Sequence, residues 1–66
     1  MRVVVNGSSR ETPEGTTLAG LLDEMDANRP GVAVAIHDEV VPRAQWPATV
    51  LVADAAVEVL TAVQGG

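Results

Sequence analysis

The stretch Gly31-Val32-Ala33-Val34-Ala35-Ile36 is the clearest strand signal in this chain of 66 residues, and the expected fold can be built outward from it. Successive side chains of a strand point to opposite faces, so Val32, Val34 and Ile36 share one face and the two alanines share the other. Both faces are therefore apolar. A strand that is apolar on both faces needs covering on each side, and we expect it to lie in a central part of a sheet.

A helix is expected before this strand, because one apolar stripe runs along the preceding segment. Apolar residues at i, i+3, i+4 and i+7 lie on one face of a helix. The chain has this spacing at Leu18, Leu21, Leu22 and Met25. Either Thr16 or Thr17 can accept a free backbone N–H at the start of the helix. Residues 28–31, which include a proline, should end it.

A hairpin is expected at the N-terminus. Residues 2–6 form a short β-branched run, and Asn6-Gly7 follows it. Asn-Gly after such a run predicts a tight hairpin turn, since both residues tolerate positive φ. The second strand, from about residue 9 to 12, is polar and should form an edge of the sheet. Pro13-Glu14-Gly15 then predicts a second turn.

The segment after the central strand is expected to be irregular. His37-Asp38-Glu39 is a turn candidate, in which we interpret His37 as an exposed side chain because no catalytic grouping accompanies it. Val40-Val41 resume a short strand.

Residues 42–46 are too short for a helix and are interpreted as one tight turn that Pro47 ends. This turn should seat Trp46, the only aromatic side chain, at the edge of the core. Residues 49–52 can form either a short strand or an extended loop that turns one of two aliphatic side chains inward, Val50 or Leu51.

The last predicted elements are a turn at 54–56 and a strand at 57–63. Alternation places Val57, Val59 and Thr61 toward the core, and Glu58, Leu60 and Ala62 on the opposite face. The N-terminal and C-terminal strands can then lie side by side in parallel, with the helix crossing one face of the sheet. We therefore expect an α+β protein with a β-grasp (ubiquitin-like) fold: a mixed four- or five-stranded sheet on one main helix. The domain should span residues 1–62, followed by a flexible Gly-Gly tail at 63–66.

Composition excludes several classes of function. The chain has no cysteine and one histidine, so we expect neither a disulfide nor a metal site. Its net charge is −5, with nine carboxylates, four arginines and no lysine. Nucleic-acid binding is not expected, because basic side chains supply most of that affinity.

The first residues enter a strand at once, which predicts no signal peptide. No apolar run approaches the roughly 20 residues of a membrane span. We therefore expect a cytoplasmic protein that makes no membrane contact and is a monomer when free.

In length and order of elements the whole chain resembles the ThiS family, the sulfur carrier of bacterial thiamine biosynthesis, which is related to the molybdopterin-synthase small subunit and to ubiquitin. The most specific parts are the Val-Pro-Arg-x-x-Trp segment and the Gly-Gly terminus. The residues that carry the resemblance are 5–7, 13–17 with Leu21-Leu22, 32–36, 40–43 with Gln45-Trp46, and 57–66. Two turns depart from the family: His37-Asp38 stands where members often have Asn-Gly or a similar pair, and Asp54-Ala55-Ala56 where they usually have Asp-Gly-Asp.

The resemblance implies that Gly66 is the covalent carrier and that this chain is a protein co-substrate with no catalytic residues or bound cofactor of its own. An E1-like (ThiF-type) enzyme using ATP and magnesium would adenylate the Gly66 carboxylate. A cysteine desulfurase or another persulfide source would supply sulfur to form a thiocarboxylate. A ThiG-type thiazole synthase would accept the sulfur. Gly65, Gln64 and Val63 would thread the narrow channels of these partners, because a glycine pair can adopt extended or positive-φ conformations that other residues cannot. Because glycine has no Cβ, the acyl carbon of Gly66 would also be open to attack.

Parity in the outer strands predicts a surface beside the tail. Leu60 should face away from the core, and Val4 should share its face one strand away. We interpret them as an exposed apolar patch on which partner enzymes dock. Arg43 can meet a partner or pair with a nearby carboxylate.

Three other functions remain open. They are a sulfur carrier for molybdopterin synthesis, a ubiquitin-like protein modifier and, in a different class, a passive β-grasp interaction module.

Overall fold

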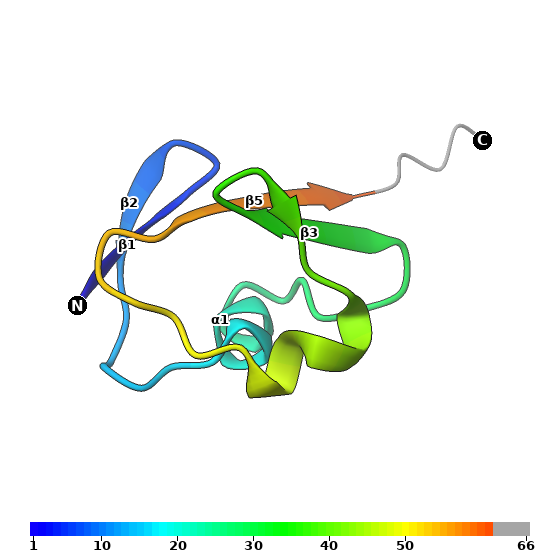
Figure 1. Ribbon diagram of the computed structural model, residues 1–66, viewed down its shortest axis with the longest axis horizontal. Coiled ribbons are helices and arrows are strands. Elements are labelled where there is room, and N and C mark those ends of the chain that lie inside the picture. The colour runs from blue at the N-terminus through cyan, green and yellow to red at the C-terminus, as the bar shows by residue number, and fades with distance from the viewer. Residues whose placement is uncertain (62–66) are drawn as a thin grey trace.

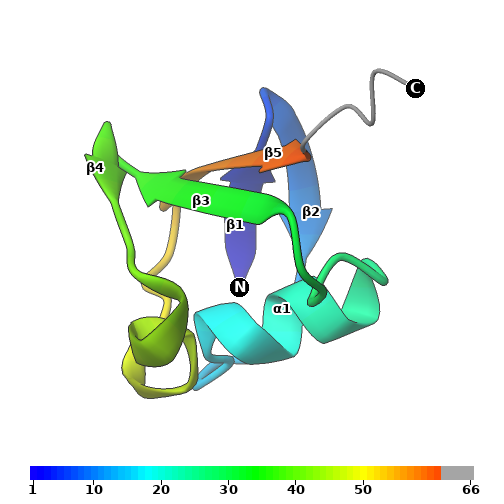
Figure 2. The same cartoon turned by 90° about the vertical axis from the view of Figure 1, so that its right-hand side faces the viewer.

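The computed structural model describes residues 1–61, in which five strands form one sheet on one side of two short helices (Figures 1 and 2). The domain end expected at residue 62 and the tail expected at 63–66 lie outside the described residues. In chain order the elements are β1 (Arg2–Val5), β2 (Ser8–Glu11), α1 (Leu18–Glu24), β3 (Val32–Ile36), β4 (Glu39–Val40), the 3-10 helix η1 (Arg43–Ala48) and β5 (Ala56–Thr61).

The sheet has the strand order β2-β1-β5-β3-β4, so the first and last strands of the chain are neighbours near its centre. β1 and β5 run parallel, while the other pairs of neighbouring strands are antiparallel. In Figure 2 the sheet lies above α1, and η1 lies beside the helix on the same side. This arrangement confirms the predicted β-grasp fold, with five strands.

The core lies between the sheet and the two helices. α1 contributes three leucines that are completely buried, at 18, 21 and 22. The sheet contributes small branched side chains from three strands, namely Val3, Val5, Val34, Val57 and Val59. Burying one such aliphatic side chain stabilises the fold by about 1.5–3 kcal/mol. α1 is only seven residues long, too short to be stable alone, so packing holds it in place.

The start of α1 shows which threonine is the cap. The Thr17 hydroxyl oxygen accepts a hydrogen bond from the Gly20 N–H (3.1 Å), whereas the Thr16 hydroxyl donates to the Pro13 carbonyl (2.6 Å). The extended segment 49–52 runs alongside this start. The Leu18 N–H donates to the Thr49 carbonyl (2.8 Å).

In the same segment, the side chain that turns inward is that of Leu51 and not that of Val50. The Leu51 N–H donates to the Thr16 carbonyl (2.9 Å), and the Leu51 side chain is buried. Val50 forms an isolated antiparallel bridge with Thr17 and remains 59% exposed. Residues 49–52 are therefore an extended loop with Leu51 as its core contact.

Two hairpins close through tight turns in which both central residues have positive φ. In the first turn Asn6 has φ 50° and Gly7 has φ 83°, as a type I′ turn requires. In the second, His37 has φ 49° and Asp38 has φ 69°. The second turn therefore has positive φ at both positions, as an Asn-Gly turn does, but a residue with a Cβ, Asp38, occupies the position that glycine takes in the first turn.

Several local predictions differ from the structure, and four of them have a clear physical reason. The turn predicted at 37–39 is only two residues long, so β4 covers Glu39–Val40 instead of 40–41. The tight turn predicted at 42–46 is a six-residue 3-10 helix, and Pro47 lies inside it. The helix tolerates this proline because the bonds around it use other donors: the Gln45 N–H reaches Pro42 and the Thr49 N–H reaches Trp46.

The third correction concerns the turn predicted at 54–56. Asp54 alone has positive φ (65°), Ala55 is a core residue that is 1% exposed, and Ala56 already belongs to β5. The Ala55 N–H donates to the Val52 carbonyl (3.1 Å), so the turn comes earlier than expected.

The fourth concerns Thr61, which has the parity of a core residue but is exposed. It pairs with Val32 at the end of the sheet, where Val32 is itself only half-buried.

Candidate functional site

β5 carries the chain toward its C-terminus and is held on both sides by the sheet. All five residues of β3 pair with it, from Ile36 opposite Val57 to Val32 opposite Thr61. On its other side, β1 pairs with its first two residues. Thr61 is the last described residue, so the predicted carrier Gly66 and the threading residues 63–65 lie outside the described part of the chain. What the structure establishes is the strand from which they follow.

Asn6 holds the middle of β5 where β1 has already ended. Its side-chain Oδ1 accepts a hydrogen bond from the Val59 N–H (2.8 Å), and its Nδ2 donates to the Val59 carbonyl (3.2 Å). The Asn6 backbone N–H also donates to the Val57 carbonyl (2.9 Å). The side-chain amide therefore replaces the next backbone unit of β1, and it satisfies both backbone groups of Val59 on that side.

The face of the sheet away from the helices, here called the outer face, contains both predicted docking residues. Val4 pairs with Ala56, so it lies beside the start of β5 and is half-buried. Leu60 is 69% exposed and lies four residues further along β5, about 13 Å away along a strand. Glu58 has the same parity and lies between them.

Val4 and Leu60 thus share the predicted face but do not form one continuous patch. The apolar neighbours of Leu60 come from the other side of β5, where Ala33 pairs with it. Val40, which is 77% exposed, pairs with Ala35 on the same face. The outer face therefore has two apolar areas with a carboxylate between them, and the docking role of Val4 and Leu60 stays a prediction.

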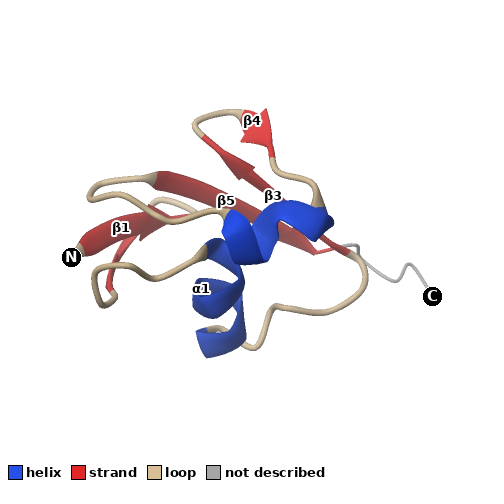
Figure 3. Cartoon of the chain, turned by 60° about the horizontal axis from the view of Figure 1, so that its bottom comes forward, coloured by secondary structure: helices blue, strands red, loops and turns tan. Residues whose placement is uncertain are grey.

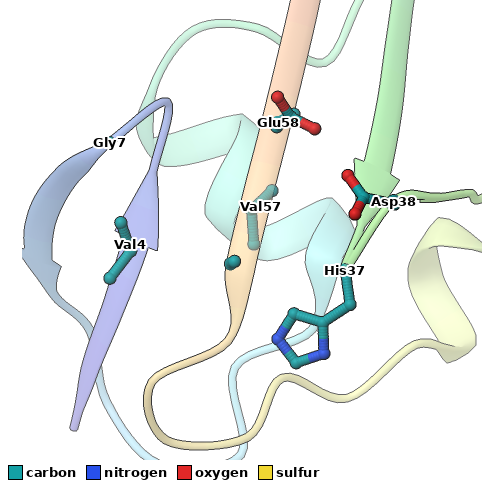
Figure 4. A pocket seen from close by; sticks show the side chains of 7 residues that line it. Val4, Gly7, His37, Asp38, Val57 and Glu58 are labelled. Atoms are coloured by element: carbon teal, nitrogen blue, oxygen red, sulfur yellow. The ribbon is translucent and has the colours of Figure 1, made fainter.

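An open hollow of about 460 Å³ occupies the outer face between the two type I′ turns (Figure 4). It is lined by Val4, Gly7, His37, Asp38, Ala56, Val57 and Glu58. Figure 4 shows the His37 side chain beside the start of β5, with the Asp38 and Glu58 carboxylates further along the hollow. His37 is exposed, as predicted. Sequence reasoning missed this hollow because its walls are turns about 30 residues apart in the chain.

Within residues 1–61, no group of three or more histidine, aspartate and glutamate side chains is arranged to hold a metal ion. In the same range, no helix is long and apolar enough to cross a membrane. The structure combines a partly apolar outer face with a final strand that is paired on both sides.

Trp46 fills the core between η1 and the sheet. It is 2% exposed, and its indole Nε1–H donates to the Val41 carbonyl (2.9 Å). Residues 42–46 were expected to seat Trp46 at the edge of the core; its side chain lies within the core, and a 3-10 helix, not a single turn, holds it there.

Comparison with known proteins gives a consistent picture. The model of the ThiS family matches residues 3–66. The sulfur carrier protein ThiS of Escherichia coli (strain K12) is 35% identical over 46 residues, which cover 70% of each chain. The crystal structure of the thiamine biosynthesis protein ThiS from Geobacter metallireducens superposes with a TM-score of 0.84 at 29% identity and covers all of both chains. A solution NMR structure of a thiamine biosynthesis protein from Geobacter metallireducens gives 0.81 at 30% identity, covering all of this chain and 88% of that one.

The family match extends over nearly the whole sequence, including the Gly-Gly end, and the same five-stranded fold recurs in the solved structures. This chain belongs to the ThiS family.

Proposed function

We propose that this chain is a sulfur carrier of thiamine biosynthesis, whose C-terminal Gly66 is converted to a thiocarboxylate that supplies the sulfur of the thiazole ring. The observation that carries the proposal is the family match over residues 3–66, which includes Gly65-Gly66. The anchoring of β5 supports it, because a carrier must present its reactive end from a body that partner enzymes can hold.

The chemistry requires activation first. An α-carboxylate is a resonance-stabilised anion at neutral pH and a poor electrophile. A carboxylate oxygen of Gly66 attacks the α-phosphorus of ATP and releases pyrophosphate, which leaves an acyl-adenylate. The terminal sulfur of a persulfide then attacks the acyl carbon and displaces AMP. A second thiol cleaves the S–S bond, so that a disulfide forms and the thiocarboxylate is released.

Each step places the demanding chemistry on a partner. A ThiF-type enzyme binds ATP and magnesium and forms the adenylate, a cysteine desulfurase or another persulfide source supplies the sulfur, and a ThiG-type thiazole synthase consumes it. Gly65 and Gly66 have no Cβ, so no side chain blocks access to the acyl carbon that reacts. The carrier itself acts as a co-substrate in the cytoplasm and contributes no catalytic residue.

Docking is proposed to use the outer face. Leu60 and Val4 supply apolar contact, and Glu58 between them favours a basic group on the partner. The net charge of −5 favours the encounter with such a partner electrostatically.

The proposal is tested by intact mass after incubation with a ThiF-type enzyme, magnesium-ATP and a sulfur donor. Exchange of one carboxylate oxygen for sulfur adds about 16 Da. A variant that lacks Gly66 should remain folded but show no gain, because its reactive carboxylate is displaced. No gain in the full chain, with an enzyme that loads another carrier, would favour a passive β-grasp module. Covalent attachment to other proteins would favour a modifier.

The pathway is tested separately from the loading. Deleting the gene should make growth depend on added thiamine. If the deletion strain grows normally without thiamine but loses the activity of its molybdenum-cofactor enzymes, the carrier belongs to molybdopterin synthesis instead.

A further inference from the structure

Arg43 joins two parts of the fold that are distant in sequence. Its Nη1 donates to the Arg29 backbone carbonyl (2.9 Å), and its Nη2 donates to the Asn28 side-chain Oδ1 (3.3 Å). Its guanidinium carbon also lies 4.9 Å from the centre of the Trp46 ring, within the range of a cation–π contact. Among residues 1–61 the structure gives Arg43 no carboxylate partner; instead, Arg43 binds the loop between α1 and β3. A contact between Arg43 and another protein stays a prediction.

The platform that carries Arg43 is rigid. Trp46 is almost completely buried and is oriented by its hydrogen bond to Val41. A guanidinium that lies over this ring and donates two hydrogen bonds to one loop has its donors directed at that loop.

The loop that Arg43 holds is also tied to α1. The Ala27 N–H donates to the Leu22 carbonyl (2.7 Å), and the Asn28 Nδ2 donates to the Asp23 carboxylate (2.9 Å). Arg43 adds the connection to η1, so the loop is fixed from two directions. Figure 3 shows this loop running from α1 to the start of β3, at the end of the molecule where β5 also ends.

The loop leads directly into the strand that pairs with the end of β5. Gly31 has φ 87°, and the next residue, Val32, pairs with Thr61. Within residues 1–61, the last hydrogen-bonded pair at this end is Ala33 with Leu60. This follows from alternation along an antiparallel pair, because Val34 and Val59 direct backbone groups to other neighbours, Val41 and Asn6.

We propose that Arg43 is a positioning residue for sulfur loading: by clamping the α1–β3 loop it keeps β3 paired with the end of β5, and so fixes the point from which the Gly-Gly tail leaves the sheet. This inference rests on the proposed carrier function. It also gives a role to the Val-Pro-Arg-x-x-Trp segment, in which Val41 orients Trp46 and Trp46 supports Arg43.

The effect on loading follows from populations. Only carriers whose β5 end is paired would bind the adenylating enzyme well. The apparent affinity of the carrier for the enzyme is then its intrinsic affinity multiplied by the paired fraction, whereas the rate at which bound carrier reacts is unchanged. Arg43→Met should raise the KM for the carrier in ATP–pyrophosphate exchange about 3–10-fold, with kcat within about twofold. Arg43→Lys keeps the cation over Trp46 but cannot form the two-pronged contact, so its KM should be intermediate.

Arg29→Met is the matched control, because it removes a cation from the same loop while leaving the backbone carbonyl that Arg43 binds. Its KM should stay within about twofold of the parent. An equal rise in Arg29→Met and Arg43→Met, or a parental KM in Arg43→Lys, would show that charge alone matters. Either result overturns the proposal, as does an unchanged KM in Arg43→Met.

Backbone hydrogen exchange tests the clamp without any partner enzyme. In Arg43→Met the Leu60 and Ala33 amides should exchange several-fold faster, while the Glu58 amide, in the next hydrogen-bonded pair, keeps the parental rate. Unchanged exchange at Leu60 overturns the clamp even if loading is normal. If Leu60 exchanges faster in Arg43→Met but the parent protein is never adenylated, the clamp is supported and the carrier function is refuted. The failure of the clamp and the failure of the carrier function can therefore be distinguished.

Discussion

Replacing Asn6 should reveal how much of the stability of β5 depends on one side-chain amide. This residue has positive φ (50°) and makes two hydrogen bonds to the backbone of Val59, at 2.8 and 3.2 Å. Asn6→Ala removes both bonds and forces a residue with a Cβ and no compensating polar contact into the left-handed region. Asn6→Gly removes the same bonds but adopts this backbone freely. The two variants therefore separate the contribution of the bonds from that of the backbone conformation.

The expected magnitudes follow from these contacts. Each neutral hydrogen bond contributes about 1 kcal/mol net, so Asn6→Gly should lower the free energy of unfolding by about 2 kcal/mol. The left-handed backbone adds about 1 kcal/mol for alanine, so Asn6→Ala should lower it by about 3 kcal/mol. A domain of this length has about 3–10 kcal/mol in total. At about 4–8 °C for each kcal/mol, Asn6→Ala should melt about 12–24 °C below the parent.

Urea unfolding followed by circular dichroism and by Trp46 fluorescence measures these differences directly, with Ser9→Ala on the exposed edge strand β2 as a control. The control should stay within about 0.5 kcal/mol of the parent. The slope of the transition should be unchanged, because the surface exposed on unfolding is the same. An Asn6→Gly protein as stable as the parent would refute the role of the amide, and an Asn6→Gly protein less stable than Asn6→Ala would refute the role of the backbone conformation.

Three further predictions concern the turn, the helix and the outer face. Replacing His37-Asp38 by Asn-Gly should raise the free energy of unfolding by about 1 kcal/mol, since both positions have positive φ; a lower melting temperature would contradict this. Gly20→Ala should add about 0.5–1 kcal/mol, because a Cβ there would make only ordinary contacts, the nearest at 3.4 Å from the Thr17 hydroxyl; destabilisation would show that the cap is disturbed. Leu60→Asp should leave the melting temperature within a few degrees but raise the KM for adenylation about tenfold or more, whereas Val52→Asp, also exposed but outside the sheet, should not; equal KM values would remove Leu60 from the docking face.

Local patterns predicted the fold well because several independent signals agree. The Leu18–Leu21–Leu22 stripe specifies one face of the helix. The strand from Val32 to Ile36 is apolar on both faces, and the structure places its larger side chains, with Val34 buried, against the helix. Asn6-Gly7 specifies the first turn by backbone conformation alone. The edge position of β2 followed from its polarity.

The errors have two causes: some deciding contacts are distant in sequence, and one depends on the hydrogen-bond pattern of a 3-10 helix. Ala55 was assigned to a turn, yet it is buried, and its neighbour Asp54 accepts hydrogen bonds from the Arg2 guanidinium (2.9 and 3.0 Å) on the first strand. Pro47 was expected to end a turn, but a short 3-10 helix does not need its missing N–H.

For the candidate site, parity correctly placed Val4 and Leu60 on the same face. It could not show their separation along β5, because the register between β1 and β5 is set by pairing and not by local sequence. The clamp made by Arg43 was equally invisible, since its acceptors lie on a loop about 15 residues earlier.

Fragmentation mass spectrometry of the loaded chain shows directly whether Gly66 itself carries the sulfur. Every C-terminal fragment that contains Gly66 should gain about 16 Da, and fragments that end before Gly66 should keep their unmodified mass. The gain should disappear when thiazole synthase and its substrates are added. A gain located on any other residue, or a loaded chain whose Gly66 retains both oxygens, would rule out Gly66 as the sulfur carrier.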